Sequence, residues 1–217
     1  GVEQLDYVIA SHPDSDHTGG VAQVLEELPV GELVVYPWPQ EMRQSLEFQS
    51  LEEAAVECSV PVREVVPGDR IPLGGTELQV LGPLKAYEDT NNCSLVLRLD
   101  YLGFSSLFCG DIENSAELDL VKSGLDLEVE LLKVAHHGSA GSSSQRFLEA
   151  VSPEVAVISV GPDNSELPRE ETLVRLEEVG AKIYRTDTDG DLVISWDGDQ
   201  LTLWSEYHNT LERIEDP

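Results

Sequence analysis

The SHPDSDHTGG segment, residues 11–20, places two histidines and two aspartates within six positions. The motif His12-x-Asp14-x-Asp16-His17 follows an apolar, strand-like run and precedes a Gly-Gly pair. Four such groups within about one turn repel one another, and burying them is costly, unless a cation binds them. A solvated helix-capping turn would explain one of the aspartates but not both flanking histidines. The spacing therefore predicts a metal site.

Two further segments place metal-capable side chains directly after apolar runs. In SLFCGDIE, Asp111 follows a strand-like run and a glycine. In LLKVAHHGSAGSSS, His136 and His137 precede a Gly/Ser-rich turn whose backbone amides can hold an anion. The three motifs contain four of the five histidines, and His208 is the exception. Since α/β folds place their sites where strands end, the three motifs together indicate one metal site.

Short β-branched runs alternate with amphipathic segments along the 217 residues, which predicts a single α/β layered domain spanning residues 1–217. The expected strands cover residues 5–10, 32–36, 62–66, 76–81, 94–100, 104–109, 129–135, 155–160, 182–186, 191–196 and 200–204. The expected helices cover residues 19–28, 44–57, 115–123, 142–151 and 170–179. No apolar run approaches the roughly 18 residues needed to cross a bilayer, so we expect no membrane-spanning segment in this chain.

The charge of the chain constrains its partners. Acidic residues outnumber basic ones by 42 to 13, giving a net charge of −29. Such a surface repels nucleic acid unless cations or a partner supply positive charge. A nuclease that carries its own metal ions is still compatible with this composition. The three cysteines show no C-x-x-C spacing, and their odd number argues against a disulfide scaffold.

The motifs HPDSDHTGG, FCGDIE and KVAHHGS resemble the successive metal-binding motifs of the metallo-β-lactamase superfamily. NNCSLVLRLDYLGFSSLFCGDIE and GAKIYRTDTDGDLVISWDG are similar to the C-terminal domain of ComEC-type proteins, the membrane channels for DNA uptake. This resemblance implies a four-layer αββα sandwich. Because relatives have several strands before the first motif, we expect that those strands lie outside this sequence or that the N-terminal sheet is incomplete.

The resemblance also implies a set of metal ligands. His12 and Asp14 match the first metal position, and Asp111 matches the carboxylate that bridges both positions. Asp16 and His17 match the second position, which a last histidine completes. The implied ligands are His12, Asp14, Asp16, His17, Asp111 and His136.

The last histidine leaves an alternative open, because either His136 or His137 fits the motif. The resemblance favours His136 as the ligand, with His137 beside the substrate. Two departures from the family pattern concern the metal ligands. Asp14 stands where most relatives have a histidine, and the usual third histidine of the first position is missing near Asn91. In addition, Leu167 occupies a position that often carries histidine in ComEC-type domains.

Carboxylate oxygens outnumber nitrogen ligands at the first position. Hard oxygen ligands favour Mn²⁺ or Mg²⁺ over Zn²⁺, which prefers histidine and cysteine. We therefore expect two divalent ions as cofactors, with Mn²⁺ preferred, weak occupancy at the first position, and Zn²⁺ as an alternative at the second.

The activity that the resemblance implies is a metal-dependent DNase, acting by two-metal phosphodiester hydrolysis on one strand of incoming DNA. Asp16 would orient the nucleophile, Asp111 would bridge the metals and His137 would protonate the leaving oxygen. The expected contacts to phosphate oxygens are Asn92, Ser94 and Ser139. The implied partners are DNA as substrate and a membrane channel portion of a larger protein, on the extracytoplasmic face of the cell membrane.

Two other functions are compatible with the residues. One is a phosphodiesterase for small or choline-type phosphoesters, since relatives with similar motifs have that activity. The other is a catalytically inactive binding domain, which the missing histidine, Leu167 and the net charge favour. β-Lactam hydrolysis is disfavoured, because Asp14 and the missing histidine remove the zinc ligands that it requires.

Overall fold

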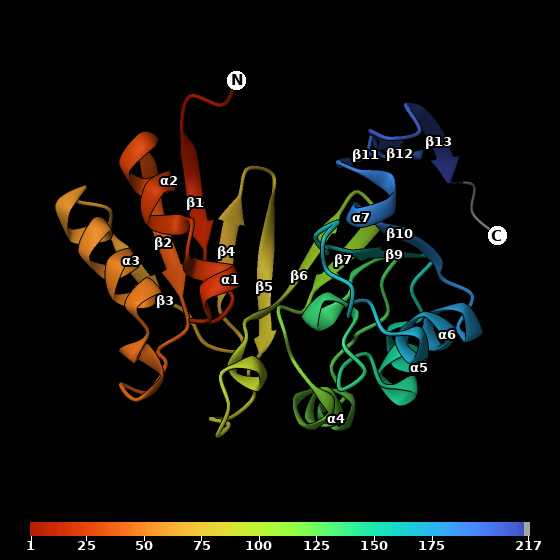
Figure 1. The fold of residues 1–217 in the computed structure, drawn as a ribbon, viewed down its shortest axis with the longest axis horizontal. Helices are drawn as coiled ribbons and strands as arrows, with labels where there is room; N and C mark the ends of the chain where they lie inside the picture. Colours follow the sequence, from red (N-terminus) through yellow and green to blue (C-terminus); the bar gives the residue numbers. More distant parts are fainter. Residues whose placement is uncertain (215–217) are drawn as a thin grey trace.

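The computed structural model describes residues 1–214, apart from the side chain of Glu47. Two β layers pack face to face, and helices cover the outer side of each layer (Figure 1). This arrangement is the four-layer αββα sandwich that the sequence predicted. Within residues 1–214, none of the helices combines the length and apolar character required to cross a bilayer.

The first layer contains a parallel three-stranded sheet in the order β1-β2-β3. Its strands are β1 (Leu5–Ile9), β2 (Val30–Val35) and β3 (Val62–Glu64). Parallel neighbours require crossover connections, and helices provide them here. These are α1 (Ser15–Thr18), α2 (Val21–Glu27), η1 (Met42–Gln44) and α3 (Leu46–Glu57). The apolar sides of α2 and α3 pack on the outer face of the sheet, around Leu33 and Trp38.

The second layer is a seven-stranded sheet in the order β10-β9-β8-β7-β6-β5-β4. Its strands are β4 (Arg70–Leu73), β5 (Thr76–Gly82), β6 (Val96–Tyr101), β7 (Phe104–Phe108), β8 (Leu131–Lys133), β9 (Val155–Ile158) and β10 (Lys182–Arg185). The part from β4 to β7 is antiparallel, and the part from β7 to β10 is parallel. The helices that cover its outer face are α4 (Asn114–Ser123), α5 (Gln145–Val151) and α6 (Glu170–Glu178).

A third, antiparallel sheet in the order β11-β12-β13 completes the fold after α7 (Thr186–Asp189). Its strands are β11 (Leu192–Trp196), β12 (Leu201–Ser205) and β13 (Thr210–Ile214). Leu201 and Leu203 pack against Phe104 and Tyr184 of the seven-stranded sheet. The inner face of that sheet therefore carries the β1–β3 sheet at one end and the β11–β13 sheet at the other.

An apolar cleft of about 610 Å³ lies between the seven-stranded sheet and β11. Phe104 and Phe108 of β7 contribute to its lining, together with Trp196 of β11. Phe108 is 38 % exposed although β7 is the central strand of the seven. Within residues 1–214, β1 and β11 each pair on one side only, so the first β layer is discontinuous between them.

The expected elements are all present, with ends that differ by a few residues. The sequence analysis missed two strands, β4 and β13, and two four-residue helices, α1 and α7. Pro72 explains the first omission, because proline argues against a strand in sequence patterns yet is tolerated on the edge strand that β4 forms. The β13 residues lack an apolar run, and their strand depends on pairing with β12.

Candidate metal centre

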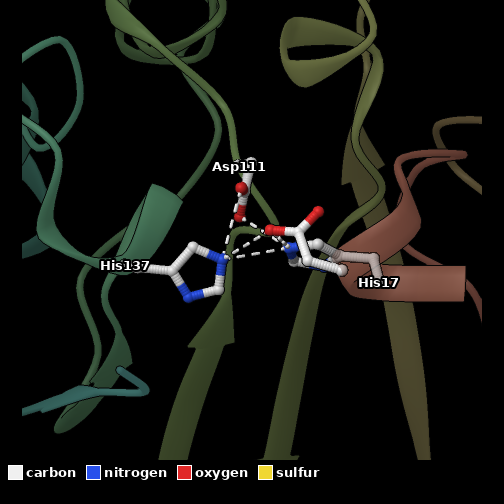
Figure 2. A group of neighbouring side chains, drawn as sticks. His17, Asp111 and His137 are labelled. Atoms are coloured by element: carbon white, nitrogen blue, oxygen red, sulfur yellow. Dashed lines mark hydrogen bonds and ion pairs between the residues drawn. The ribbon is translucent and has the colours of Figure 1, made fainter. Parts of the chain in front are cut away.

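Three chain segments from both β layers meet at one end of the sandwich. The first follows β1 and includes α1, the second is the turn after β7, and the third is η3 (Ala135–Gly138), which follows β8. Figure 2 shows one side chain from each segment, His17, Asp111 and His137, pointing toward a common centre. Residues far apart in the sequence therefore form one group, as the three motifs predicted.

The central group consists of Asp16, His17, Asp111 and His137. One ligand atom from each lies within 4.8 Å of all the others. The Nε2 atom of His17 is 3.3 Å from Oδ1 of Asp111, and Nε2 of His137 is 3.5 Å from Oδ2 (Figure 2). The two Nε2 atoms are 3.2 Å apart, and Oδ2 of Asp16 is 3.6 Å from Nε2 of His137. This spacing places nitrogen and oxygen donors around one point.

His12 and Asp14 extend the group beside Asp111 and His17. Nε2 of His12 lies 3.7 Å from Oδ2 of Asp14 and 4.0 Å from Oδ2 of Asp111. His12 is fully buried, yet its Nε2 has no hydrogen-bond partner among residues 1–214. Asp14 occupies the N-cap position of α1 without a side-chain capping bond in the described structure. The Asp14 carboxylate is therefore not used in capping α1, and it lies against Nε2 of His12.

Hydrogen bonds at Nδ1 orient the histidine rings. Oγ of Ser11 lies 3.2 Å from Nδ1 of His12 and 3.1 Å from Nδ1 of His17, so one hydroxyl oxygen can accept from both rings. Nδ1 of His137 donates to the carbonyl oxygen of Ser159 at 2.7 Å. A partner at Nδ1 fixes the tautomer that leaves Nε2 free for a metal. The sequence analysis missed Ser11 and Ser159, since neither residue type signals this role.

The electrostatics favour the ligand forms of Asp111 and His12, whereas the hydrogen bond to Asp111 raises the pKa of His137. Burial alone would raise the pKa of Asp111, but hydrogen bonds from His137 and His17 hold it well below its usual range. Burial and the neighbouring His17 lower the pKa of His12 to about 4, against the attraction of nearby aspartates. Asp111 is therefore ionised and His12 neutral near pH 7, as metal binding requires.

The donors fit divalent cations. Three carboxylates and three imidazoles converge, and the buried, unpartnered Nε2 of His12 needs a cation or proton donor to offset its burial. Ions such as Mn²⁺ accept this mixture of oxygen and nitrogen ligands. The side chains that would hold the ions are His12, Asp14, Asp16, His17, Asp111 and His137.

The structure reverses the order of preference between the two adjacent histidines. His137 belongs to the central group, whereas Nδ1 of His136 lies 3.3 Å from Oε1 of Glu113 and its Nε2 is 4.0 Å from Asp111. Both residues have a left-handed backbone, with φ of 48° and 51°. Strand alternation therefore does not apply to them. The observed positions favour His137 as the ligand, whereas the resemblance favours His136.

Two of the expected substrate contacts also need correction. Asn92 is only 3 % exposed: its Oδ1 accepts from the backbone of Glu113 and Ala116, and its Nδ2 donates to Asp89. Ser94 is fully buried, and its Oγ accepts from the backbone N–H of Asp111 at 3.0 Å. Both side chains are turned away from solvent. Their hydrogen bonds to backbone groups position the turn that carries Asp111.

Ser139, the third expected contact, lies closer to the open side of the site. It is half-buried, its N–H donates to the carbonyl of His136, and its Oγ accepts from Gly141. Lys133 of β8 is the lysine next to this segment. Burial lowers the pKa of its ammonium group, and its Nζ donates to the carbonyl of Val134. A phosphate contact by Ser139 stays a prediction.

The fold and the donor set define a class: an αββα protein with a metal centre at the end of its β layers. The chain belongs to the metallo-beta-lactamase superfamily, whose family model matches residues 1–161.

Comparison with curated proteins shows which members of this superfamily the chain resembles. The chain is 31 % identical over 194 residues to ComE operon protein 3 of Bacillus subtilis and 36 % identical over 195 residues to Competence protein ComA of Neisseria gonorrhoeae; each match covers 88 % of this chain and 25 % of the relative. Recombination protein 2 of Haemophilus influenzae is 27 % identical, with 92 % and 23 % coverage. The expected resemblance to competence proteins is confirmed, and the chain spans about a quarter of their length.

Solved structures confirm the fold class. CmlA, a diiron beta-hydroxylase from Streptomyces venezuelae, superposes with a TM-score of 0.56 at 14 % identity, and a CmlA mutant with 0.59 at the same identity. Both matches cover 85 % of this chain and 44 % of the other chain. At this identity the likeness concerns the fold alone.

The observed positions predict that His137→Ala and His136→Ala differ in metal binding. We expect His137→Ala to weaken Mn²⁺ binding about a hundredfold, since it removes a nitrogen donor from the central group, and His136→Ala to change it less than about threefold. Calorimetric titration of the metal-stripped variants measures both. Equal losses in the two variants would contradict the assignment of His137.

Gly138 provides a second prediction, because its φ is +81° and an added Cβ would lie 2.5 Å from Cβ of Pro168. Gly138→Ala should shift η3 and weaken Mn²⁺ binding about tenfold, in addition to roughly 1–2 kcal/mol of left-handed backbone strain. Gly161→Ala is the matched control, since an added Cβ there meets nothing within 4 Å. Unchanged Mn²⁺ affinity in Gly138→Ala would show that η3 tolerates displacement.

Proposed function

We propose that this chain is a metal-dependent phosphodiester hydrolase that cleaves DNA with the help of two divalent ions, preferentially Mn²⁺. The single observation that carries the proposal is the shared Asp111 carboxylate, whose Oδ1 lies 3.3 Å from Nε2 of His17 and whose Oδ2 lies 3.5 Å from Nε2 of His137 and 4.0 Å from that of His12. When bound, a pair of divalent ions supplies Lewis acidity for attack of water on phosphorus and for the charge of the departing oxygen.

The side chains at the open side of the centre would handle the protons. Asp16 is 62 % exposed and its carboxylate reaches both His17 and His137, so it can orient the attacking water and accept a proton. We assign proton donation to the leaving oxygen to His136, in place of His137, because Nε2 of His137 lies closer to Asp111, at 3.5 Å, than Nε2 of His136, at 4.0 Å. His136 is partly exposed and lies against Glu113, which can hold its ring in place.

DNA as the substrate is supported by the relatives, one of which is named a competence protein and another a recombination protein. In a longer protein of that kind, this chain would degrade one strand of incoming DNA beside a membrane channel portion, on the extracytoplasmic face. The net charge of −29 opposes DNA binding by these residues alone. We infer that basic segments outside this sequence supply that contact; tight binding of DNA by this chain at low salt without metal would overturn the inference.

A second candidate is hydrolysis of small phosphodiesters. Its specific support is the acidic rim of the centre, where the carboxylates of Asp14, Asp16 and Glu113 are all more than a third exposed. A small diester can enter such a site without laying a polyanion across the rim.

Cleavage of end-labelled single- and double-stranded DNA tests the proposal. The metal-stripped protein is assayed with Mn²⁺, Mg²⁺ or Zn²⁺, beside Asp111→Asn and the exposed control Asp163→Asn. We expect Mn²⁺-dependent cleavage that falls about a hundredfold or more in Asp111→Asn, because the shared carboxylate becomes a neutral amide, and is unchanged in Asp163→Asn.

A chromogenic small diester is assayed in parallel. Cleavage of this diester alone would replace the DNase proposal with the second candidate. Absence of both activities despite measurable Mn²⁺ binding would overturn hydrolysis by this chain.

A further inference from the structure

The loop from Gly138 to Ser144, called here the 138–144 loop, connects the metal-site histidines to α5. It begins directly after His137, contains Ser139, and ends at Ser144, the N-cap of α5. Ser143 within it has a left-handed backbone with φ of 53°, which costs a non-glycine residue energy. The loop therefore needs external contacts to keep this shape.

Arg175 of α6 contacts one side of the loop, the carbonyl groups. Its Nε donates to the carbonyl oxygen of Ser143 at 2.8 Å, and its Nη2 donates to those of Ser142 at 2.9 Å and Ala140 at 3.3 Å. The same Nη2 lies 3.0 Å from Oγ1 of Thr172, whose hydroxyl donates to the carbonyl of Ser139. One guanidinium group thus binds three carbonyls of the loop, and Thr172 beside it binds a fourth.

Glu117 of α4 contacts the amide groups of the same loop. Its side chain is fully buried; Oε1 accepts from the N–H of Ser143, and Oε2 accepts from the N–H of Ser144 at 2.9 Å. A buried carboxylate is costly unless hydrogen bonds and an opposite charge compensate it. The two amides and the attraction of Arg175 offset part of this cost, although burial still raises the pKa of the Glu117 carboxyl.

The serine hydroxyls do not account for the position of the loop. Oγ of Ser142 and Oγ of Ser143 are buried without a partner in the part of the chain that the structure describes. The backbone of the loop is instead bound by two oppositely charged side chains from different helices. Loss of either would leave buried carbonyls or amides unpaired, so the loop would move to new partners.

We propose that Glu117 and Arg175 are positioning residues for the metal centre: by fixing the 138–144 loop they set the place of His137 and of Ser139 beside it. The proposal rests on the proposed metal-binding function of that centre. Neither residue touches the central group, so both act through the loop.

The test compares Glu117→Gln and Arg175→Lys with matched controls on α5, Glu149→Gln and Arg146→Lys, both exposed. In each test variant we expect Mn²⁺ affinity to fall about ten- to hundredfold, as for other residues that orient metal ligands. Hydrogen exchange at the amides of Ser143 and Ser144 should accelerate in Glu117→Gln, because glutamine offers one acceptor oxygen where the carboxylate offers two. The controls should match the wild type in both readouts.

A further variant separates positioning from general stability. Ile71→Ala removes a buried side chain of β4, in a core cluster that contains none of the proposed metal ligands, and should lower the thermal midpoint without changing Mn²⁺ affinity. If Mn²⁺ affinity falls in Ile71→Ala as it does in Glu117→Gln, or stays unchanged in both test variants, the proposal is overturned. Failure of the wild type to cleave DNA would overturn the DNase function alone, since Mn²⁺ affinity and amide exchange are measured independently of cleavage.

Discussion

The burial of one carboxylate among three imidazoles is the interaction on which the rest of this structure depends. Asp111 is 3 % exposed and faces His12, His17 and His137. An ionised carboxylate is costly to bury without partners, and the hydrogen bonds from His137 and His17 offset this cost. Because the partners come from β1 and β8 while Asp111 follows β7, this interaction also joins the two β layers.

The surrounding residues hold the centre through backbone and ring contacts. Ser11 and Ser159 engage the Nδ1 atoms, and Ser94 binds the backbone beside the carboxylate. Asn92 links the same turn to the start of α4, and Glu117, one turn further along α4, reaches the loop after His137. α4 thus contacts two of the three segments that carry the metal-site side chains. A helix outside the centre therefore helps to set the geometry of the centre.

The group as a whole could be predicted from the sequence because polar side chains stand directly after apolar runs. Parallel strands end on the same edge of a sheet, which brings these side chains together. It could not decide between His136 and His137, since two consecutive left-handed residues abolish the alternation on which such an argument depends. Asn92 and Ser94 were misassigned for a different reason. Their amide and hydroxyl groups suit a phosphate equally well, and only their burial reveals that they bind backbone.

Anomalous diffraction from crystals grown with Mn²⁺ tests the central claim most directly. The account predicts two Mn²⁺ peaks on either side of the Asp111 carboxylate, one contacting Asp16, His17 and His137 and the other contacting His12 and Asp14. Peaks that contact His136 in place of His137, or no peak within bonding distance of Asp111 at saturating Mn²⁺, would contradict it.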